Sequence, residues 1–432
     1  FECDIPGAGF VQSCYEILSQ KVENENQHRL LYDIEMPLAE VLAAMEYRGF
    51  AVDRQGIEEF GEKLREMIDK TREEIYVLVG EKFNLNSPKQ LAHALFEVMG
   101  LPSGKKTKTG YSTNAETLEN LRQYSPVIDM ILNYRTYQKL NSTYVEGLID
   151  KIKPDGRIHS TFNQTEARTG RISSSEPNLQ NIPVRTKLGS EMRKFFVAKP
   201  GYVLLDADYS QIELRILAHI SGDKVMQTAF LKGEDIHTRT AAQVMGIPTS
   251  MVTPQIRSRA KAVNFGIVYG ISAFSLAKDI GTTVREAQDF IDNYFKNFSG
   301  VKDYLDNTVK FAQENGYVTT IYNRKRMLPE INSSNKNVRS VGKRMAMNTP
   351  IQGTSADIIK IAMVKVYNRL KAEGLKSKLI LQVHDELIVE APADEADKAA
   401  KILHEEMVNA AKLDIPLKAD VNSGKNWYIA KG

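Results

Sequence analysis

Apolar residues recur every three to four positions over several parts of the chain, which is the pattern of an amphipathic α-helix. The longest helix is expected over about residues 54–79, with its apolar face at Ile57, Phe60, Leu64, Ile68, Ile75 and Leu78. A further helix is expected to begin with Ser87 as its N-cap and Pro88 in its first position. Other helices are expected from Met36, throughout a helix-rich stretch of about 223–313, and over about 394–412.

Apolar runs of strand length lie between these helices. They cover about residues 156–162, 202–208, 318–322, 379–383, 387–391 and 417–421. The fourth and fifth of these runs predict a hairpin with a tight turn at His384 and Asp385. Strands separated by long helical insertions are typical of a mixed α+β fold with helical lobes.

The composition bounds the class of protein. A chain of 432 residues is long enough for about two to four domains of roughly 100–200 residues each. No apolar run approaches the roughly 20 residues that cross a bilayer, and two cysteines, Cys3 and Cys14, are too few for a disulfide framework. The chain begins at Phe1 without the features of a signal peptide. We expect a reduced intracellular compartment, and we interpret residues 1–30 as the remnant of a preceding domain.

The basic residues are unevenly distributed, although the net charge is only +3. Residues 236–278 contain no acid, and residues 322–356 contain seven basic residues against one acid, Glu330. Such blocks favour a polyanion partner because phosphates attract them; a solvated basic face is the alternative. The loop 102–113 carries Lys105, Lys106 and Lys108 and is assigned to phosphate-backbone contact, with a plain mobile loop as the alternative. It fails the spacing of a nucleotide-binding P-loop.

Two aspartates stand at the ends of apolar strands. Asp208 ends the run 202–208, and Asp385 lies in the predicted hairpin turn. A buried carboxylate is costly unless it is paired or binds a metal. If the two strand ends meet, these residues could share two Mg²⁺ ions about 3.5–4 Å apart, the arrangement that serves phosphoryl transfer. The alternative is a helix cap and an ordinary turn residue, and a separation of 177 residues does not decide between them.

One predicted helix, about 255–270, combines cations with aromatics. Arg257, Lys261, Phe265 and Tyr269 recur every four residues, so their side chains lie along one slowly drifting stripe. The cations could bind a triphosphate and the aromatics could stack on a base or a sugar. The alternative places both aromatics in the core. A glycine C-cap is expected at Gly270.

Several segments together resemble one known family. Residues 208–215, 257–270 and 382–386 resemble motifs A, B and C of the family A DNA polymerases, the bacterial DNA polymerase I family. Residues 169–174, 177–183, 235–237 and 350–354 are also similar to that family. The resemblance covers about residues 31–432 in the family's order, and so much agreement in register is far more specific than any one motif.

The resemblance implies roles for individual residues. Asp208, Asp385 and the backbone of Tyr209 would bind two Mg²⁺ ions, which Mn²⁺ could replace. Lys261 would grip the triphosphate and donate a proton to the leaving pyrophosphate, and Glu213 would exclude ribonucleotides by occupying the space of a 2′-hydroxyl. The remaining residues implied for the incoming dNTP are Arg257, His237, Phe265, Gln211 and Tyr269, of which Tyr269 would stack at the templating position. Primer or template would contact Arg171, Asn181, Asn348, Gln352 and His384.

The resemblance also implies an architecture and a biological setting. We expect a right-hand fold with an antiparallel palm sheet formed by the predicted strands and with helical thumb and fingers. The expected boundaries are palm 31–45, 150–222 and 341–432, thumb 46–149, and fingers 223–340. The implied protein is a monomeric, cytoplasmic, nucleoid-associated bacterial DNA-directed DNA polymerase of replication and repair, with primer–template DNA and dNTPs as partners and no membrane. Residues 1–30 are too short to hold the acids of a proofreading exonuclease, so none is expected.

Two other functions are alternatives to DNA synthesis. A single-subunit RNA polymerase shares the two aspartates and the basic helix, but Glu213 within the sequence Gln211-Ile212-Glu213 argues against it. A DNA-binding relative that has lost its chemistry is disfavoured because both aspartates, Arg257 and Lys261 are intact.

Overall fold

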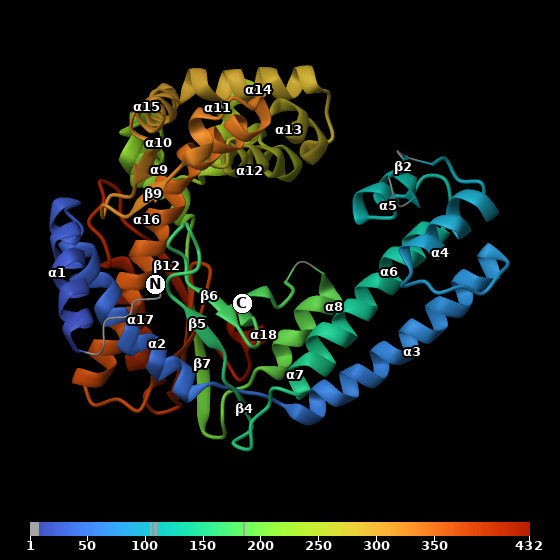
Figure 1. The fold of residues 1–432 in the computed structure, drawn as a ribbon, viewed down its shortest axis with the longest axis horizontal. Coiled ribbons are helices and arrows are strands. Elements are labelled where there is room, and N and C mark those ends of the chain that lie inside the picture. Colours follow the sequence, from blue (N-terminus) through green and yellow to red (C-terminus); the bar gives the residue numbers. More distant parts are fainter. Residues whose placement is uncertain (1–7, 104–105, 108–109, 185) are drawn as a thin grey trace.

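The chain forms a mixed α+β structure in which an antiparallel sheet lies between two helical lobes (Figure 1). The computed structural model describes residues 8–103, 106–107, 110–184 and 186–432. Within this part of the chain, no helix is both long and apolar enough to span a membrane. The α+β class expected from the sequence is confirmed.

The central sheet has four strands, all antiparallel. Their order is β10 (Lys378–Val383), β11 (Glu386–Pro392), β7 (Tyr202–Tyr209) and β12 (Ala419–Gly424). The strands are contacted by α2 (Met36–Arg48), α16 (Lys336–Ala372), α17 (Ala396–Val408) and the short C-terminal helix α18 (Trp427–Ala430). Every residue of β11 is buried, so the strand that borders the Asp385 turn is fixed on both of its faces.

A helical arm projects from the sheet (Figure 1). Its helices are α3 (Arg54–Val79), α4 (Pro88–His93), α5 (Ala115–Leu121) and α6 (Val127–Lys139). The distal part of the arm has a hydrophobic core of its own, built from residues between Ile68 and Tyr134. The expected helix 54–79 is confirmed, and so is the cap at Ser87, whose hydroxyl accepts from the backbone N–H of Gln90.

A second helical lobe lies over the other end of the sheet (Figure 1). It contains α9 (Ile212–Ser221), α10 (Lys224–Leu231), α11 (Ile236–Met245), α12 (Pro254–Val268), α13 (Ala273–Ile280), α14 (Val284–Asn297) and α15 (Ser299–Asn315). Helix α12 ends in a Schellman motif, because Gly270 (φ +65°) donates to Ile267 and Ile271 donates to Gly266. The expected helix-rich stretch and the glycine C-cap are therefore confirmed.

Further elements lie outside the two lobes or between them. The helices are α1 (Ala8–Asn24), α7 (Gly147–Ile149), α8 (Lys187–Ser190) and α18 (Trp427–Ala430), and a π-helical segment, Leu30–Glu35, runs into α2. The two-residue strands β2 (Lys106–Thr107) and β3 (Gly110–Tyr111) pair at the tip of the arm.

Two predicted strands do not join the central sheet, which corrects the expectation that all of them would. The stretch 156–162 divides into β4 (Arg157–Ile158), which pairs with β1 (Phe50–Ala51), and β5 (Thr161–Asn163), which pairs with β6 (Ser173–Ser175). The β-structure is interrupted at Ser160, whose hydroxyl donates to the carbonyl of Pro177.

The stretch 318–322 forms a separate hairpin of β8 (Tyr317–Thr319) and β9 (Lys325–Met327). The first strand stops because the Thr320 hydroxyl donates to buried Asp357 and accepts from the backbone N–H groups of Tyr322 and Arg324. These contacts close a turn where the apolar pattern alone predicts a continuing strand.

A buried ionic cluster ties the sheet to α2 and β4. The carboxylate of Glu390 on β11 is fully buried and accepts from Arg48 (2.7 Å) and Arg157 (3.1 Å). Burial raises the pKa of Glu390, but the two guanidinium groups outweigh it and hold that pKa below its ordinary value. Replacing Glu390 by alanine leaves Arg157 buried without its carboxylate, so we expect the free energy of unfolding to fall by about 3–5 kcal/mol.

Urea unfolding followed by the fluorescence of the single tryptophan, Trp427, measures this loss. The difference in the free energy of unfolding between the wild type and Glu390→Ala should have its full size above pH 4.5, the ordinary pKa of a glutamate. It should shrink as the pH falls through the lowered pKa of Glu390. Glu62→Ala is the matched control, because Glu62 is exposed on α3 without an ion pair in the described structure. Equal stability of Glu390→Ala and Glu62→Ala would contradict the prediction.

Candidate active site

Strand pairing brings Asp208 and Asp385 together. Strands β7 and β11 are antiparallel, with Glu386 directly opposite Asp208. The backbone N–H of Tyr209 donates to the carbonyl of Asp385 over 3.2 Å. His384, at φ +55°, and Asp385 form the two-residue turn between β10 and β11. Two residues that are 177 positions apart in the sequence are thus neighbours across one sheet.

Four carboxylates gather at this end of the sheet: Asp206, Asp208, Asp385 and Glu386. Burial raises the pKa of Asp385 to about 7, and the negative charge of Asp208 adds to the shift. Burial and a hydrogen bond with Glu386 raise the pKa of Asp206 to about 9. The neighbouring cation Lys431 donates to Asp208 Oδ2 over 2.9 Å. The site therefore holds more acids than it can keep ionised without further positive charge.

This excess of carboxylates fits divalent metal ions. Asp206 Oδ2 is buried and lacks a hydrogen-bond partner. Among the residues that the structure describes, no group of three or more His, Cys, Asp or Glu side chains forms a preformed metal cage. Asp208 and Asp385 supply two carboxylates, which is the protein share expected when Mg²⁺ is completed by substrate phosphates and water. The donor set is thus suited to a metal that arrives with a phosphorylated substrate.

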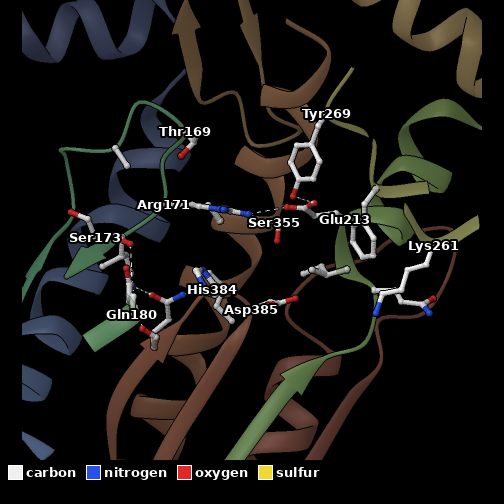
Figure 2. Close-up of a pocket in the computed structure, with 18 of the residues that line it drawn as sticks. Thr169, Arg171, Ser173, Gln180, Glu213, Lys261, Tyr269, Ser355, His384 and Asp385 are labelled. Atoms are coloured by element: carbon white, nitrogen blue, oxygen red, sulfur yellow. Dashed lines mark hydrogen bonds and ion pairs between the residues drawn. The ribbon is translucent and has the colours of Figure 1, made fainter. Parts of the chain in front are cut away.

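A cavity of about 640 Å³ adjoins the carboxylates. The predicted site residues that line it are Arg171, Gln211, Glu213, His237, Arg257, Lys261, Phe265, Tyr269, His384 and Asp385. Figure 2 shows the side chains of Asp385 and Lys261 directed into the same space. The cationic and aromatic stripe of α12 therefore faces a carboxylate of the strand ends across one cavity.

The cationic side of the cavity is held by α11. Asp235, the N-cap of α11, accepts from Arg257 over 2.7 Å, and this contact helps to lower the carboxyl's pKa despite its burial. Burial lowers the pKa of His237 to about 4, so its imidazole is neutral at pH 7. Asn264 donates to His237 Nδ1 over 2.9 Å, which assigns the proton to Nε2. His237 can therefore donate a hydrogen bond but contributes no charge.

Glu213 is held from two sides. Arg171 donates to its Oε1 over 2.8 Å, and the Tyr269 hydroxyl donates to its Oε2 over 3.0 Å (Figure 2). Burial raises the pKa of Glu213, while Arg171 opposes that shift. The carboxylate is thus a fixed part of the cavity wall, between the loop of Arg171 and the end of α12.

The residues predicted to contact DNA are less closely grouped. Arg171 and His384 line the cavity, whereas Asn181, Asn348 and Gln352 are not among its lining residues. Asn348 and Gln352 lie one turn apart on α16, and Asn181 ends a short helical turn near the Tyr144 hydroxyl. Lys105 and Lys108 lie outside the described residues, and the backbone of Lys106 belongs to β2.

The structure adds four residues that sequence reasoning missed. Glu386 and Asp206 lie beside Asp208, and Lys431 contacts both Glu386 and Asp208. Asn264 fixes the tautomer of His237. Glu386 and Asp206 each lie within two residues of a predicted metal ligand, and this closeness in the sequence is the signal that points to them. No pattern in the sequence connects Lys431 to this site.

Known proteins are similar to most of this chain. A family model described as DNA polymerase family A matches residues 54–429. The chain is 53% identical to DNA polymerase I of Caldicellulosiruptor bescii over 94% of its own length and 48% of the relative's. It is 51% identical to DNA polymerase I of Lactococcus lactis, over 96% of this chain and 47% of the relative. It is 49% identical to DNA polymerase I of Geobacillus stearothermophilus, over 98% of this chain and 49% of the relative. The chain therefore spans about half the length of these relatives.

A solved structure matches the fold. The POL domain of Pol1 from M. smegmatis, in complex with DNA primer-template and dNTP, superposes with a TM-score of 0.91 at 43% identity. The match covers 96% of this chain and 74% of that one. The fold that the chain shares with this domain is the right-hand polymerase fold. The chain belongs to DNA polymerase family A, and the right-hand architecture expected from the sequence is confirmed.

Proposed function

We propose that this chain catalyses template-directed DNA synthesis, adding a dNMP from a dNTP to a primer 3′-hydroxyl and releasing pyrophosphate. The observation that carries the proposal is the single cavity in which Asp385, beside Asp208, faces Arg257, Lys261 and Tyr269. Acids for metal ions, cations for a triphosphate and an aromatic for a base are the groups that this reaction requires. Family membership and a structural neighbour solved with primer-template and dNTP support the same conclusion.

Within this proposal, α12 receives the nucleotide. Lys261 is exposed in the cavity and has no ion-pair partner among the described residues, so its ammonium is available to the phosphates and can donate a proton to the leaving pyrophosphate. Arg257 would exchange Asp235 for the triphosphate, and His237 would donate from Nε2. Phe265 and Gln211 would border the sugar, and Tyr269 would stack at the templating position.

The proposed metal ligands are Asp208, Asp385 and the backbone carbonyl of Tyr209. Two Mg²⁺ ions bound there would stabilise the charge that develops on the attacking and leaving oxygens. The chain's own contribution is to hold both carboxylates at adjacent strand ends, so that the primer hydroxyl and the α-phosphate meet beside them. Mn²⁺ would substitute, because it accepts the same oxygen ligands.

The remaining parts of the proposal concern DNA. Arg171, His384, Asn348 and Gln352 would contact the minor groove near the primer end, where the acceptor pattern is similar for all base pairs. The DNA backbone would be contacted by Asn181, Lys105, Lys106 and Lys108.

We propose that the sheet lobe is the palm, the arm within 46–149 the thumb, and the helical lobe within 223–340 the fingers. The protein would act as a monomer on the bacterial chromosome, in replication or repair.

Primer extension tests the proposed function. The purified chain is incubated with a labelled primer–template, Mg²⁺ and the four dNTPs, and we expect template-dependent elongation that EDTA abolishes. Efficient elongation with rNTPs would instead favour an RNA polymerase. Tight primer–template binding without elongation in Mg²⁺ or Mn²⁺ would favour a DNA-binding relative that lacks the chemistry, and either result would refute the proposal.

Glu213 provides a test of sugar selection. Because Arg171 and Tyr269 hold its carboxylate in the cavity wall, we expect Glu213→Ala to open space for a 2′-hydroxyl. The preference for dNTP over rNTP, measured as the ratio of kcat/KM values, should fall by about 10²-fold or more, because relieving one steric clash is worth several kcal/mol.

Glu213→Gln is the matched variant, since it keeps the size of the side chain and removes its charge. A steric role predicts that Glu213→Gln retains most of the selectivity that Glu213→Ala loses. Unchanged selectivity in Glu213→Ala would contradict the steric role. Equal losses in both variants would assign selection to the charge instead.

A further inference from the structure

Lys431 is a cation within the carboxylate cluster that neither the sequence motifs nor the proposed chemistry uses. Its ammonium donates to Asp208 Oδ2 over 2.9 Å and also to Glu386 Oε2. The Lys431 side chain is 33% exposed, and that of Glu386 is 5% exposed. The contact with Asp208 thus lies at the edge of the site, where a carboxylate oxygen can exchange one cation for another.

The position of Lys431 is fixed by α18. The indole of Trp427, which begins this helix, is fully buried and donates from Nε1 to Glu386 Oε1 over 2.7 Å. The backbone N–H of Trp427 donates to Phe196, and the guanidinium of Arg193 lies 3.8 Å from the indole ring. The backbone N–H of Lys431 donates to Trp427. The ammonium of Lys431 is therefore positioned by a helical turn that is itself held in place by the contacts of Trp427.

A second cavity, of about 510 Å³, lies beside Lys431 and shares His384 and Asp385 with the first. Lys431 has room on this side to move its ammonium while the helix stays in place. Glu386 remains as a partner after such a movement, because it is held by Trp427 and lies opposite Asp208 in the strand register. Lys431 can therefore release Asp208 without becoming unpaired.

We propose that Lys431 is the resident counter-ion of Asp208 and must release Oδ2 before Asp208 can bind a divalent metal ion. Lys431 is a positioning residue: it neutralises and orients the carboxylate while no metal is bound, and it opposes metal binding in the absence of substrate. This inference rests on the proposed function, since it takes Asp208 as a metal ligand. Its consequence is that the chain acquires its metals together with the nucleotide, whose phosphates supply the remaining ligands of the metal ions that displace Lys431.

Manganese binding without DNA or nucleotide tests this role. Free Mn²⁺ is measured by electron paramagnetic resonance as it is titrated into the protein. Lys431→Met removes the competing charge at similar length, so we expect Mn²⁺ to bind about fivefold to tenfold more tightly than to the wild-type chain. Without metal, the melting temperature of Lys431→Met should be lower, and saturating Mn²⁺ should raise it more than it raises that of the wild type.

Two matched variants complete the experiment. Lys431→Arg keeps the cation and should retain the wild-type Mn²⁺ affinity. Lys425→Met makes the same charge change at an exposed lysine that has no ion pair in the described structure, and it should also leave the affinity unchanged. Lys431→Gln replaces the methionine variant if that variant does not fold. Equal or weaker Mn²⁺ binding by Lys431→Met, or equal tightening by Lys425→Met, would overturn the inference.

This titration is independent of primer extension. A chain that fails to extend primers but shows the expected order of Mn²⁺ affinities refutes the proposed function and supports the role of Lys431 as counter-ion. If the wild type extends primers but all variants bind Mn²⁺ with equal affinity, the proposed function is supported and the role of Lys431 as counter-ion is refuted. In an active chain, the Mg²⁺ concentration for half-maximal rate should also be lower for Lys431→Met.

Discussion

Replacing Asp385 by alanine should abolish primer extension while leaving primer–template binding nearly intact. Asp385 stands in the two-residue turn that meets the end of β7, so its loss removes one of the two carboxylates that could anchor metal at the cavity. We expect the extension rate to fall by about 10³-fold or more, because metal stabilisation of the reacting oxygens is worth several kcal/mol. Single-turnover extension and the Kd for DNA, measured on the same preparation, separate the two effects.

Two variants sharpen this prediction. Asp385→Asn preserves the size of the side chain and should lose nearly as much activity as Asp385→Ala, because charge and metal ligation are what matter. Asp394→Ala is the control, since Asp394 is exposed in the turn after β11, away from the cavity. Affinity for DNA should stay within about threefold in all three, because phosphate contacts dominate it. Substantial extension by Asp385→Ala would contradict a metal-binding role.

Replacing Lys261 by alanine should impair the use of dNTP far more than the binding of DNA. Lys261 projects into the cavity from α12, one helical turn beyond Arg257, and no carboxylate of the described chain neutralises it. Removing a positioned donor to a developing charge typically costs about 10²- to 10³-fold, and we expect a fall of this size in kcat/KM for dNTP. Pre-steady-state extension over a range of dNTP concentrations measures it.

Arg259→Ala is the matched control for Lys261. It removes a cation from the same helix at a position that does not line the cavity. Its dNTP use should stay close to that of the wild type. Parallel losses of dNTP use and DNA affinity in Lys261→Ala would place this lysine on DNA instead of the triphosphate.

Local patterns predicted individual elements well. Helix α3 and the cap at Ser87 follow from apolar spacing and capping chemistry, which act within a few residues. The strand expected over 318–322 begins as predicted but ends at Thr319, because the Thr320 hydroxyl bonds to Asp357, 37 residues away. The stretch 156–162 forms two short strands and not one, and the Ser160 hydroxyl bonds to the carbonyl of Pro177 at the break. Side-chain contacts of this kind are invisible in hydrophobic periodicity.

The candidate site could be predicted only in part, because it too depends on contacts between residues that are far apart in the sequence. The spacing of Arg257, Lys261, Phe265 and Tyr269 places them on one side of a helix. Nothing in the spacing of Asp208 and Asp385 shows that they meet, because their proximity is created by the register of β7 and β11. The family resemblance supplied that link. It did not supply the neutral state of His237 or the ion pair of Lys431 with Asp208, which depend on burial and on the packing of α18.

The position of β7 inside the sheet has a consequence for synthesis of the protein. Its two neighbours, β11 and β12, begin 177 and 210 residues after β7 ends. At a translation rate of about 5–20 residues per second, a nascent chain therefore carries this apolar strand with both edges unpaired for roughly nine to thirty-five seconds. The arm, whose distal core is complete by Tyr134, can fold in that interval. Exposed strand edges invite aggregation, so slow translation and chaperones that hold nascent chains should decide how much active protein a cell obtains.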